Sequence, residues 1–319
     1  MRRIMSAGAG MATAIVLLGC ATTGPIAPLV PLPDDRMPSR EDLAYKPWRV
    51  IVAEPGGRYR ATAQAFCSVL QTRLNKYGIQ TVSSDAQSNR LIADMLRMQL
   101  EGGGEVDIRD PKYEMLSADG VITVLLTAVN VRKNNERTSW KDDEGKIHHR
   151  FDSVVQIEGS YTLAIPKTGV AQTMPFRNSD TKTSYGKPHQ FSVNAMALNA
   201  ARGAARNSAV LKPIYTRFPL AGYVIGTGDH PRYVKINRGA NHGVRRDRKW
   251  QLIMEEVEHN PLVGDMITAT VIGTVHTVEV QPEYCIAKTD SSRTRQKVKL
   301  GMKVRSIGFG FSWSGLFSD

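Results

Sequence analysis

Apolar and polar residues follow two periods along the first half of the chain, one typical of strands and one typical of helices. The β-branched run Trp48–Ala53 predicts a buried strand, and apolar residues three and four positions apart predict a helix over Ala61–Tyr77 that Gly78 ends. Ile79–Val82 predicts a second strand, and the apolar set within Ala86–Leu100 predicts a second helix. The chain therefore begins its folded part with two strand–helix units.

A series of longer strands comes next. Val121–Val131 and Phe151–Ile165 are both strongly strand-like, and Val170–Phe176 predicts a third strand after a turn. Between the first two lies a charged, polar insertion over 132–150, which we interpret as a long hairpin loop. An Ala-rich amphipathic pattern over Ser192–Leu211 predicts a closing helix. Together these patterns predict an antiparallel meander packed against helices.

The pattern changes after Pro213 and Pro219, which we interpret as a linker. From Leu220 onward, short β-patterned runs recur with turn residues between them, and such regular spacing predicts a small barrel. The predicted strands are 222–226, 233–237, 250–254, 267–280, 284–288 and 302–307. The predicted fold class is therefore α+β, with a mixed sheet flanked by helices and then a small all-β, barrel-like domain.

Glycines mark several predicted turns. Gly239 and Gly243 stand where a positive φ is often needed, and Asn260–Gly264 predicts a tight hairpin turn. The run Gly102–Gly104 is interpreted as a flexible turn, because no Lys-Ser/Thr pair comes after it and it does not lie in a strand–loop–helix context that would bind phosphate.

The first twenty residues predict where the protein is sent. Arg2 and Arg3 precede an apolar run over Ala7–Leu18, which is typical of an export signal and too short to span a bilayer. The run ends in Leu17-Leu18-Gly19-Cys20, which resembles the signal of bacterial lipoproteins. That resemblance implies cleavage before Cys20 and lipidation of Cys20, which would anchor the chain to a membrane. The alternatives are an ordinary signal peptide with a chance cysteine or an uncleaved anchor.

The residue after Cys20 is Ala21, not the Asp that suggests inner-membrane retention in many lipoproteins. We therefore expect the outer membrane, with the protein facing the periplasm. Prolines are frequent over 20–47 and predict an extended, semi-rigid spacer. The predicted segments are a signal peptide (1–19), the lipidated cysteine with its spacer (20–47), an α/β domain (48–212), a β-rich domain (220–307) and a tail (308–319).

Composition restricts the possible partners. Apolar residues make up 41% of the 319 residues, enough for folded cores, and the net charge of +12 falls to +10 when Arg2 and Arg3 are removed. A basic protein attracts anionic partners. Because the chain carries an export signal, we expect no nucleic acid; anionic lipid, lipopolysaccharide, peptidoglycan or an acidic protein surface fit better. The alternative is a solvated basic surface without a specific partner.

Reactive side chains form no recognisable catalytic pattern. Cys67 and Cys285 fall at apolar positions of a helix and a strand and are expected to be buried, although two cysteines in an oxidising compartment can also pair. His148-His149 is expected to be solvated within the charged loop. The pairs Asp142-Asp143 and Glu255-Glu256 are adjacent in sequence, so their side chains should point apart. We therefore expect no enzyme activity, no metal and no cofactor.

Two stretches resemble known families. Over about 48–212, the order of elements, the entry Leu116-Ser117-Ala118-Asp119-Gly120-Val121-Ile122, the turn Lys167-Thr168-Gly169 and the Ala-rich helix resemble the curli-secretion lipoprotein (CsgG) family and the N-terminal domain of TolB. This resemblance implies a mixed sheet flanked by helices and a role in secretion or envelope assembly. In the curli member, hairpins build a membrane barrel. Residues 132–150 lack the alternating apolar face that a lipid-facing strand needs over about 9 to 11 residues, so we expect no pore.

The second stretch, about 220–307, is similar to the C-terminal domain of flagellar assembly protein T, which implies a protein-interaction module. The usual Gly-Asp before the last strand is Gly301-Met302 here. The positions that carry the resemblance are Val234, Ile236, Asn237, Gly239, Gly243, Val244, Pro261, Gly264, Ile272, Gly273, Val275, Gly301 and Val304.

The tail, 308–319, alternates small and aromatic residues and could dock on a partner or a membrane interface, or fold back as a last edge strand. The function these observations favour is a lipid-anchored accessory in assembly or secretion of a flagellar or curli-like structure, with envelope proteins as partners. A homo-oligomer would suit the resemblance to the curli-secretion family. The alternative is a peptidoglycan-binding lipoprotein or a regulator of a cell-wall enzyme.

Overall fold

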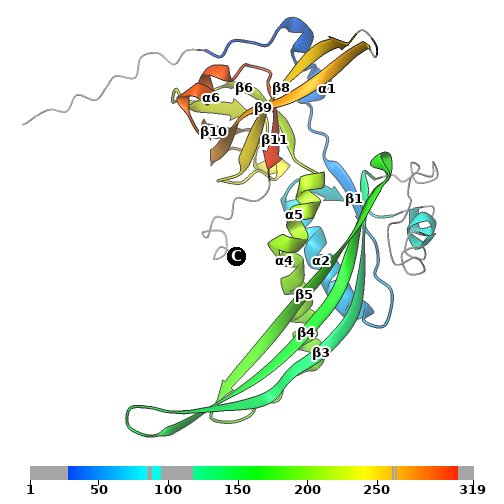
Figure 1. Ribbon diagram of the computed structural model, residues 1–319, viewed down its shortest axis with the longest axis vertical. Helices are drawn as coiled ribbons and strands as arrows, with labels where there is room; N and C mark the ends of the chain where they lie inside the picture. The colour runs from blue at the N-terminus through cyan, green and yellow to red at the C-terminus, as the bar shows by residue number, and fades with distance from the viewer. Residues whose placement is uncertain (1–27, 85–87, 95–117, 261, 263, 308–319) are drawn as a thin grey trace, which may run out of the picture.

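The computed structural model describes residues 28–84, 88–94, 118–260, 262 and 264–307. They form a five-stranded sheet with helices and a closed six-stranded barrel, joined end to end (Figure 1). The α+β class, the mixed sheet and the barrel are confirmed. The predicted tail at 308–319, the Gly102–Gly104 turn, the signal peptide and Cys20 lie outside the described residues.

The sheet has the order β2-β1-β3-β4-β5 and is mixed in direction. β1 (Trp48–Val52) runs parallel to both β2 (Ile79–Thr81) and β3 (Gly120–Lys141). β3, β4 (Ile147–Ile165) and β5 (Val170–Tyr185) form an antiparallel meander. A 3-10 turn, η3 (Pro166–Thr168), joins the last two strands and ends in Gly169, which has the positive φ that the Lys-Thr-Gly turn needs.

Three helices cover one face of this sheet: α2 (Arg60–Lys76), α4 (Val193–Arg206) and α5 (Ser208–Arg217) (Figure 1). The predicted apolar stripe of α2 is buried against Ile122, Val124 and Ile157 of the sheet, as helical spacing requires. Phe66 of α2 stacks on Phe176 of β5 with ring centroids 4.6 Å apart.

The closing helix predicted over Ser192–Leu211 is two helices. Asn207 ends α4 and its side chain accepts from the Ala209 N–H, so it caps α5. Pro213 was predicted to lie in a linker and instead lies inside α5. Although proline removes one helical hydrogen bond, burial of the neighbouring Ile214 and Tyr215 holds the segment helical.

The opposite face carries a smaller cluster, in which Ile51, Val121 and Ala164 of the sheet pack against Leu91 and Ile92. Residues 88–94 are helical, which confirms part of the helix predicted over Ala86–Leu100; the remainder of that helix lies outside the described residues.

The barrel has the strand order β10-β7-β6-β11-β8-β9. Trp250 fills its centre and donates to Thr277 Oγ1 at 2.9 Å, so the one polar atom of its ring is satisfied. Each strand overlaps its predicted range, although β8 runs six residues beyond the predicted end at Met254. The strands are β6 (Ala221–Thr227), β7 (Tyr233–Ile236), β8 (Lys249–Asn260), β9 (Gly264–Val280), β10 (Cys285–Thr289) and β11 (Lys303–Ile307). A short helix, α6 (Ser292–Lys297), lies between the last two.

Residues 28–47 are not a free spacer. Leu29 is buried in the barrel core, and Leu32 and Val30 exchange main-chain hydrogen bonds with Leu300. The segment continues through η1 (Asp34–Arg36) and α1 (Arg40–Leu43), where Ser39 forms a capping box with Asp42. We call residues 28–47 the strap. The prediction of a spacer is corrected for this part, because apolar residues between the prolines find places on the barrel.

Candidate interaction surfaces

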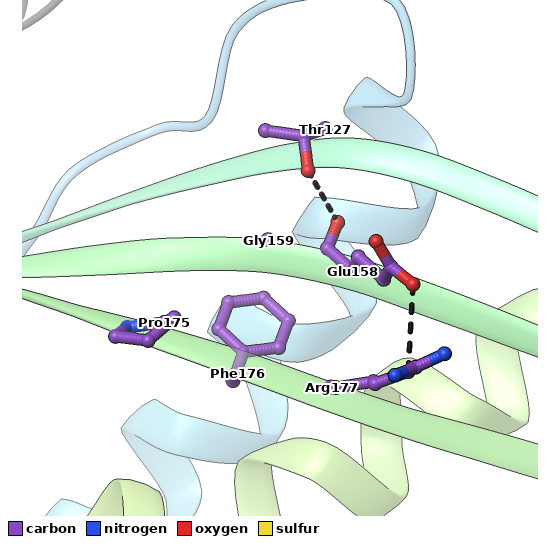
Figure 2. A pocket seen from close by; sticks show the side chains of 6 residues that line it. All are labelled: Thr127, Glu158, Gly159, Pro175, Phe176 and Arg177. Carbon is purple, nitrogen blue, oxygen red and sulfur yellow. Dashed lines mark hydrogen bonds and ion pairs between the residues drawn. The ribbon is translucent and has the colours of Figure 1, made fainter.

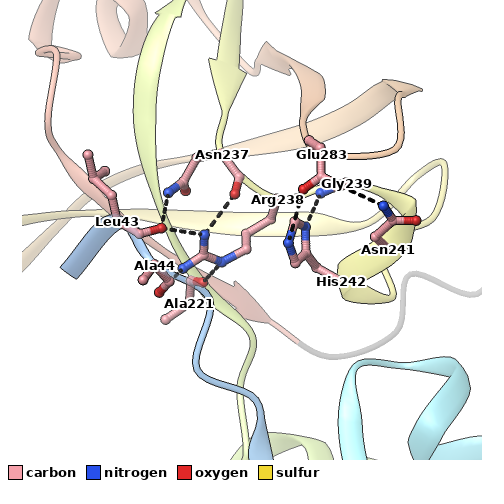
Figure 3. A network of polar contacts seen from close by, with 9 residues as sticks. All are labelled: Leu43, Ala44, Ala221, Asn237, Arg238, Gly239, Asn241, His242 and Glu283. Carbon is pink, nitrogen blue, oxygen red and sulfur yellow. Dashed lines mark hydrogen bonds and ion pairs between the residues drawn. The ribbon is translucent and has the colours of Figure 1, made fainter. Parts of the chain in front are cut away.

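Arg238 is the centre of the contact between the strap and the barrel (Figure 3). Arg238 is 5% exposed, and its side chain donates to main-chain carbonyls: Nε to Ala221 O at 2.7 Å, and Nη1 to Leu43 O at 3.2 Å and Asn237 O at 2.8 Å. Asn237 Nδ2 donates to the same Leu43 carbonyl at 3.1 Å. Burial lowers the pKa of Arg238, and the carbonyls satisfy the desolvated guanidinium.

The barrel meets the α/β unit at two glycines. Gly78 comes directly after α2 and Gly243 directly after the turn η4 (Ala240–His242); both have positive φ, 83° and 77°. A Cβ on Gly243 would lie 2.4 Å from Gly78 N, and a Cβ on Gly78 would lie 2.2 Å from His242 O. The two main chains therefore approach to a distance that only glycine allows. The predicted positive φ at Gly243 is confirmed.

Gly239 differs from the prediction, because its φ is −131°. Its need for glycine comes from close approach, since a Cβ there would lie 2.2 Å from Gln281 O. This position therefore carries the resemblance for a packing reason and not for a left-handed turn.

Aromatic and cationic side chains surround the glycine contact. Tyr45 of the strap packs edge-on against His242 with ring centroids 4.5 Å apart, and Arg238 lies 5.4 Å from the centroid of the Tyr45 ring. Arg245 and Arg248 of the barrel lie 5.2 and 5.8 Å from the centroid of the Tyr77 ring. Strap, barrel and α/β unit thus converge at one joint, which fixes how the two folded units are connected.

The longest projection of the protein is built from the stretch predicted to be a loop. Residues 132–141 belong to β3 and residues 147–150 to β4, so the hairpin loop is only the short turn between Lys141 and Ile147. β5 also runs on to Tyr185, which pairs with Arg150. We call residues 131–154 and 181–185 the arm. It extends past the helices, at the opposite end of the molecule from the barrel (Figure 1).

The arm bends where its ladder is irregular. Register shifts occur between Val131 and Lys133 and between Lys133 and Glu136, and Asn135 has a φ of 49°. Asn135 N donates to Ser153 Oγ at 3.0 Å, and its amide exchanges hydrogen bonds with the main chain of His189. These contacts hold the bulge in place and so set the curvature of the arm.

One carboxylate organises the tip of the arm. Asp142 Oδ1 accepts from the N–H groups of Glu144 and Lys146, and Oδ2 lies 2.6 Å from His148 Nε2. The His148 ring stacks on Trp140, with centroids 5.4 Å apart. The hydrogen bond from His148 holds the pKa of Asp142 below its usual range. His148 was predicted to be solvated in a loop; the structure places it on a strand with a fixed partner.

The tip displays aromatic side chains beside a cation. Trp140 is 42% exposed and Tyr185 is 70% exposed, with ring centroids 6.3 Å apart. Arg150 pairs with Asp152 at 2.9 Å, and Thr183 donates to the same carboxylate, which lowers the pKa of Asp152. Exposed aromatic rings beside a held guanidinium are suited to contact with a partner.

A hollow of 430 Å³ opens over the middle of the sheet (Figure 2). Its charged groups are neutralised: Glu158 Oε1 lies 3.4 Å from Arg177 Nε and 3.4 Å from Arg132 Nη2. Phe176 lies against Gly159, where a Cβ would be 2.8 Å from the ring. The hollow is thus lined by an aromatic ring and by charged groups that already form structural ion pairs with one another.

Among the other residues singled out in the sequence, Asp143 and Glu256 are exposed, and the cysteines and Glu255 are buried or paired. Cys67 and Cys285 are free and buried, as predicted, and burial raises the pKa of each thiol to about 12. Glu255 pairs with Lys303 at 2.7 Å. Within the described ranges, no group of three His, Cys, Asp or Glu side chains could hold a metal ion, and no helix is long and apolar enough to cross a membrane.

Two residues of the joint were missed. Tyr45 lies in a proline-rich stretch that has no periodic pattern, so nothing in the sequence links it to Gly78 or His242. Arg238 comes directly after a predicted strand and precedes Gly239. An arginine at that place only weakly indicates a buried contact, because its partners are main-chain carbonyls, which every residue type carries.

No family model matches the chain, and no curated protein matches it. Among solved structures, the chain is similar to the hypothetical protein CT253 from Chlamydia trachomatis, with 8% identity, a TM-score of 0.26 and coverage of 42% of this chain and 73% of that one. It is also similar to Lipoprotein GNA1162 from Neisseria meningitidis (12% identity, TM-score 0.22, coverage 49% and 96%). A minor lipoprotein from Acinetobacter baumannii gives 8% identity, a TM-score of 0.23 and coverage of 51% and 93%.

Two of these three proteins are bacterial lipoproteins. Similarities at these TM-scores do not establish a shared fold, and the resemblances to the curli-secretion family, to TolB and to flagellar assembly protein T stay predictions. The function is therefore inferred from the residues and contacts of the chain itself.

Proposed function

We propose that the protein is a lipoprotein anchored in the outer membrane through Cys20, facing the periplasm, where it serves as an accessory in assembling or secreting a flagellar or curli-like envelope structure. The proposal includes no catalytic step, no cofactor and no nucleic acid. It is carried by one observation: the arm lies at the opposite end of the molecule from the barrel to which the strap binds (Figure 1).

The length of chain between Cys20 and the strap limits how far the barrel can lie from the membrane. Pro28, where the strap begins, lies eight residues after Cys20, so the chain between them reaches about 28 Å at most. A lipid on Cys20 would hold the barrel close to the membrane. Because the joint at Gly78, Gly243 and Tyr45 connects the barrel to the α/β unit, the arm would then be presented away from the bilayer.

The anchor is tested by replacing Cys20 with Ser in the full chain. We expect labelled palmitate in the native protein and its complete loss in Cys20→Ser, with the protein moving from the membrane fraction to the periplasmic fraction. Cys67→Ser is the matched control, because that thiol is buried and should take no lipid. Membrane retention of Cys20→Ser without palmitate would contradict the anchor.

The accessory role is tested at the arm. A photo-crosslinking residue in place of Trp140 should capture an envelope protein of one discrete mass in cells, and the same residue at exposed Thr216 of α5 should not. Inserting ten Gly/Ser residues between Thr23 and Gly24 changes the reach of the anchor while leaving every described contact intact. We expect the insertion to weaken capture at position 140. Equal capture at both positions would contradict a partner-binding arm.

The second candidate function is peptidoglycan binding, and the tip of the arm favours it. Exposed Trp140 and Tyr185 can stack on sugar rings, and Arg150 beside them can pair with a carboxylate of the cell wall. Sedimentation with isolated cell wall tests this function. Under this function, the native protein sediments and Trp140→Ala/Tyr185→Ala does not, while Trp48→Ala serves as a control away from the arm.

A further inference from the structure

The β8–β9 hairpin extends beyond the barrel wall. β8 pairs with β11 as far as Ile253, and β10 pairs with β9 from Val275 onward. Beyond these positions the two strands of the hairpin pair with each other, as far as Asn260. We call residues 254–271 the ribbon. At about 3.3 Å per residue, its strands project about 20 Å from the barrel.

One face of the ribbon is apolar and open to solvent. Val257 pairs directly with Ile267, and Val271 lies four residues after Ile267, so the three side chains share a face. Val257 is 48% exposed, Ile267 71% and Val271 47%, and Leu262 in the turn is 92% exposed. These side chains form an aliphatic stripe that ends at the turn, and such a surface is typical of a docking site.

Charged residues of the same face lie at the ends of the ribbon. Glu255, near the barrel, pairs with Lys303 of β11 at 2.7 Å. His259 lies across from Asp265 beside the turn. The carboxylate of Glu255 is therefore already neutralised within the molecule and does not select a partner for the stripe.

The ribbon leaves the barrel at the end where the strap begins. Lys303, the first residue of β11, pairs with Ile253 at the base of the ribbon. Leu300, shortly before it, is bound to the strap: its N–H donates to Val30 O at 2.9 Å, and its carbonyl accepts from the N–H of Leu32 at 3.0 Å. The first described residues of the chain and the ribbon therefore share one end of the barrel.

The α/β unit joins the opposite end. Ser306, near the end of β11, donates its N–H to Leu220 O at 2.8 Å, and Leu220 comes shortly after α5. In Figure 1 the ribbon and the start of the strap lie on the side of the barrel away from the α/β unit. A lipid on Cys20 lies at most about 28 Å from Pro28, so it would turn this end of the barrel toward the bilayer.

Cations lie beside the base of the ribbon. A Cβ on Gly273 of β9 would lie 2.4 Å from the side chain of Thr294, so α6 packs closely there. Arg293 and Lys297 are exposed and lie four apart on α6, so they share one face of that helix. Residues 291–303 contain no carboxylate. This end of the barrel can therefore pair with anionic lipid headgroups.

We propose that the ribbon dips into the bilayer that holds the anchor, with Leu262 and the aliphatic stripe at the boundary between headgroups and acyl chains. The choice of a bilayer as the occupant rests on the proposed function, because the lipid on Cys20 is what brings a membrane to this end of the barrel. Glu256 and Glu258 are the sequence neighbours of Val257, so they lie on the opposite face and stay in water. Segments with one apolar and one charged face lie about 5 to 10 Å deep in a membrane interface.

The first experiment measures whether the ribbon enters lipid. It uses the full-length Cys20→Ser protein, purified from the periplasmic fraction, which has no lipid of its own. A polarity-sensitive probe is attached to Leu262→Cys, Ile267→Cys or Glu256→Cys, since the native thiols at 67 and 285 are buried. With vesicles of phosphatidylethanolamine and phosphatidylglycerol, we expect the probes at 262 and 267 to shift to the blue and to be quenched by nitroxides on the acyl chains. The probe at 256, on the opposite face, should stay in water.

The second experiment measures how much the ribbon contributes to binding. Leu262→Ser/Ile267→Ser should lower the fraction of protein that floats with the vesicles roughly tenfold. Ile147→Ser is the matched control, because that isoleucine is 56% exposed on the arm and should not meet lipid. Arg293→Gln/Lys297→Gln should lower flotation several-fold with these vesicles and hardly change it with phosphatidylcholine alone. Thermal midpoints should stay unchanged, since all these side chains are exposed.

Probes at 262 and 267 that stay in water, or flotation that depends on Ile147 and not on the ribbon, would overturn the proposal. So would a disulfide between two Ile267→Cys copies, or capture of a protein by a photo-crosslinking residue at position 267 in cells, because a protein would then cover the stripe. Palmitate labelling of the native protein reports on the anchor alone. Palmitate on a protein whose ribbon stays in water contradicts the ribbon only, and lipid contact of the ribbon without palmitate supports the ribbon and contradicts the anchor.

Discussion

The hydroxyl of Tyr45 donates a hydrogen bond to the main-chain carbonyl of Gly78 at 2.6 Å. Tyr45 belongs to the strap, which lies on the barrel, and Gly78 belongs to the α/β unit. One side chain thus links the strap, the barrel and the α/β unit at the place where the barrel and the α/β unit touch. Burial raises the pKa of Tyr45, so its hydroxyl stays a donor throughout the neutral range.

Replacing Tyr45 with Phe should lower the free energy of unfolding by about 1 kcal/mol, because the Gly78 carbonyl loses its donor while the ring remains. Urea unfolding followed by circular dichroism measures this change. Tyr185→Phe is the control, since that ring is 70% exposed, and its effect should be negligible. Equal effects of the two variants would show that the hydrogen bond contributes nothing.

Gly243→Ala should be more damaging than Gly145→Ala. Both glycines have nearly the same positive φ, 77° and 79°, so both substitutions carry the same backbone strain, about 1 kcal/mol. Only Gly243 has neighbours: its Cβ would lie 2.4 Å from main-chain atoms of Tyr77 and Gly78, whereas Gly145 has nothing within 4 Å. The difference between the two losses in unfolding free energy therefore measures how much the close contact at Gly243 contributes to stability. No difference would mean that the two units separate freely.

Arg238→Lys should release the strap although it preserves the charge. A single ammonium cannot reach the carbonyls of Ala221, Leu43 and Asn237 together, so buried acceptors lose their donors at a cost of about 2 kcal/mol. Amide hydrogen exchange over 28–47 should become faster. Arg246→Lys, at an exposed position, should leave exchange unchanged. Unchanged protection in Arg238→Lys would show that the other contacts, such as those of Leu29 and Leu300, hold the strap without Arg238.

The tip of the arm should loosen in acid. The pKa of Asp142 is lowered in the folded protein from its unfolded value of 3.8, chiefly by His148, so the contribution of Asp142 is present above pH 3.8 and is lost as the pH falls through the lower, folded pKa. The indole N–H signal of Trp140 in NMR spectra should shift over that range. Asp142→Asn should show the loosened tip at neutral pH, and Asp143→Asn should behave like the native protein. A shift that persists in Asp142→Asn would assign it to another group.

The two buried thiols should be inert. Burial raises the pKa of Cys67 and Cys285 to about 12 from 9.0, so at pH 8 neither forms thiolate, and a disulfide reagent should react only after unfolding. Because the folded pKa is raised, these groups favour the native state below pH 9, and that stability is lost as the pH rises towards 12. Fast native labelling at pH 8 would show that the cores open.

Helices and strands with an apolar face were predictable from the sequence. The apolar stripe on α2, which includes Phe66 and Leu70, fits only a helix with that face buried. The barrel strands were predicted because turn residues separate them. The arm was not predictable, because most of its side chains on both faces are exposed and they follow no apolar period. The pairing of its strands satisfies the hydrogen bonds of main-chain N–H and C=O groups, and the identity of the side chains does not indicate this pairing. Polar strands of this kind are therefore easily interpreted as loops.

The joint was unpredictable for a different reason. Its contacts join residues that are far apart in the chain and involve main-chain atoms, as in the pair of glycines at 78 and 243 or the carbonyl of Leu43 that receives Arg238. The sequence could indicate that Gly243 needs a positive φ, which is a local property. It could not indicate which segment comes within 2.4 Å of that glycine.

The strap makes the order of synthesis matter. Asn237 and Arg238, which donate to Leu43 of the strap, lie 194 and 195 residues after it in the chain, and Leu300 lies later still. Under the export proposed above, residues 28–47 would emerge early, while the barrel surface that receives them would be completed last. Loop closure over such separations is slow, so the early segment spends that interval unsatisfied. Because the first described segment needs the last described strands, periplasmic chaperones would then have a defined window of action.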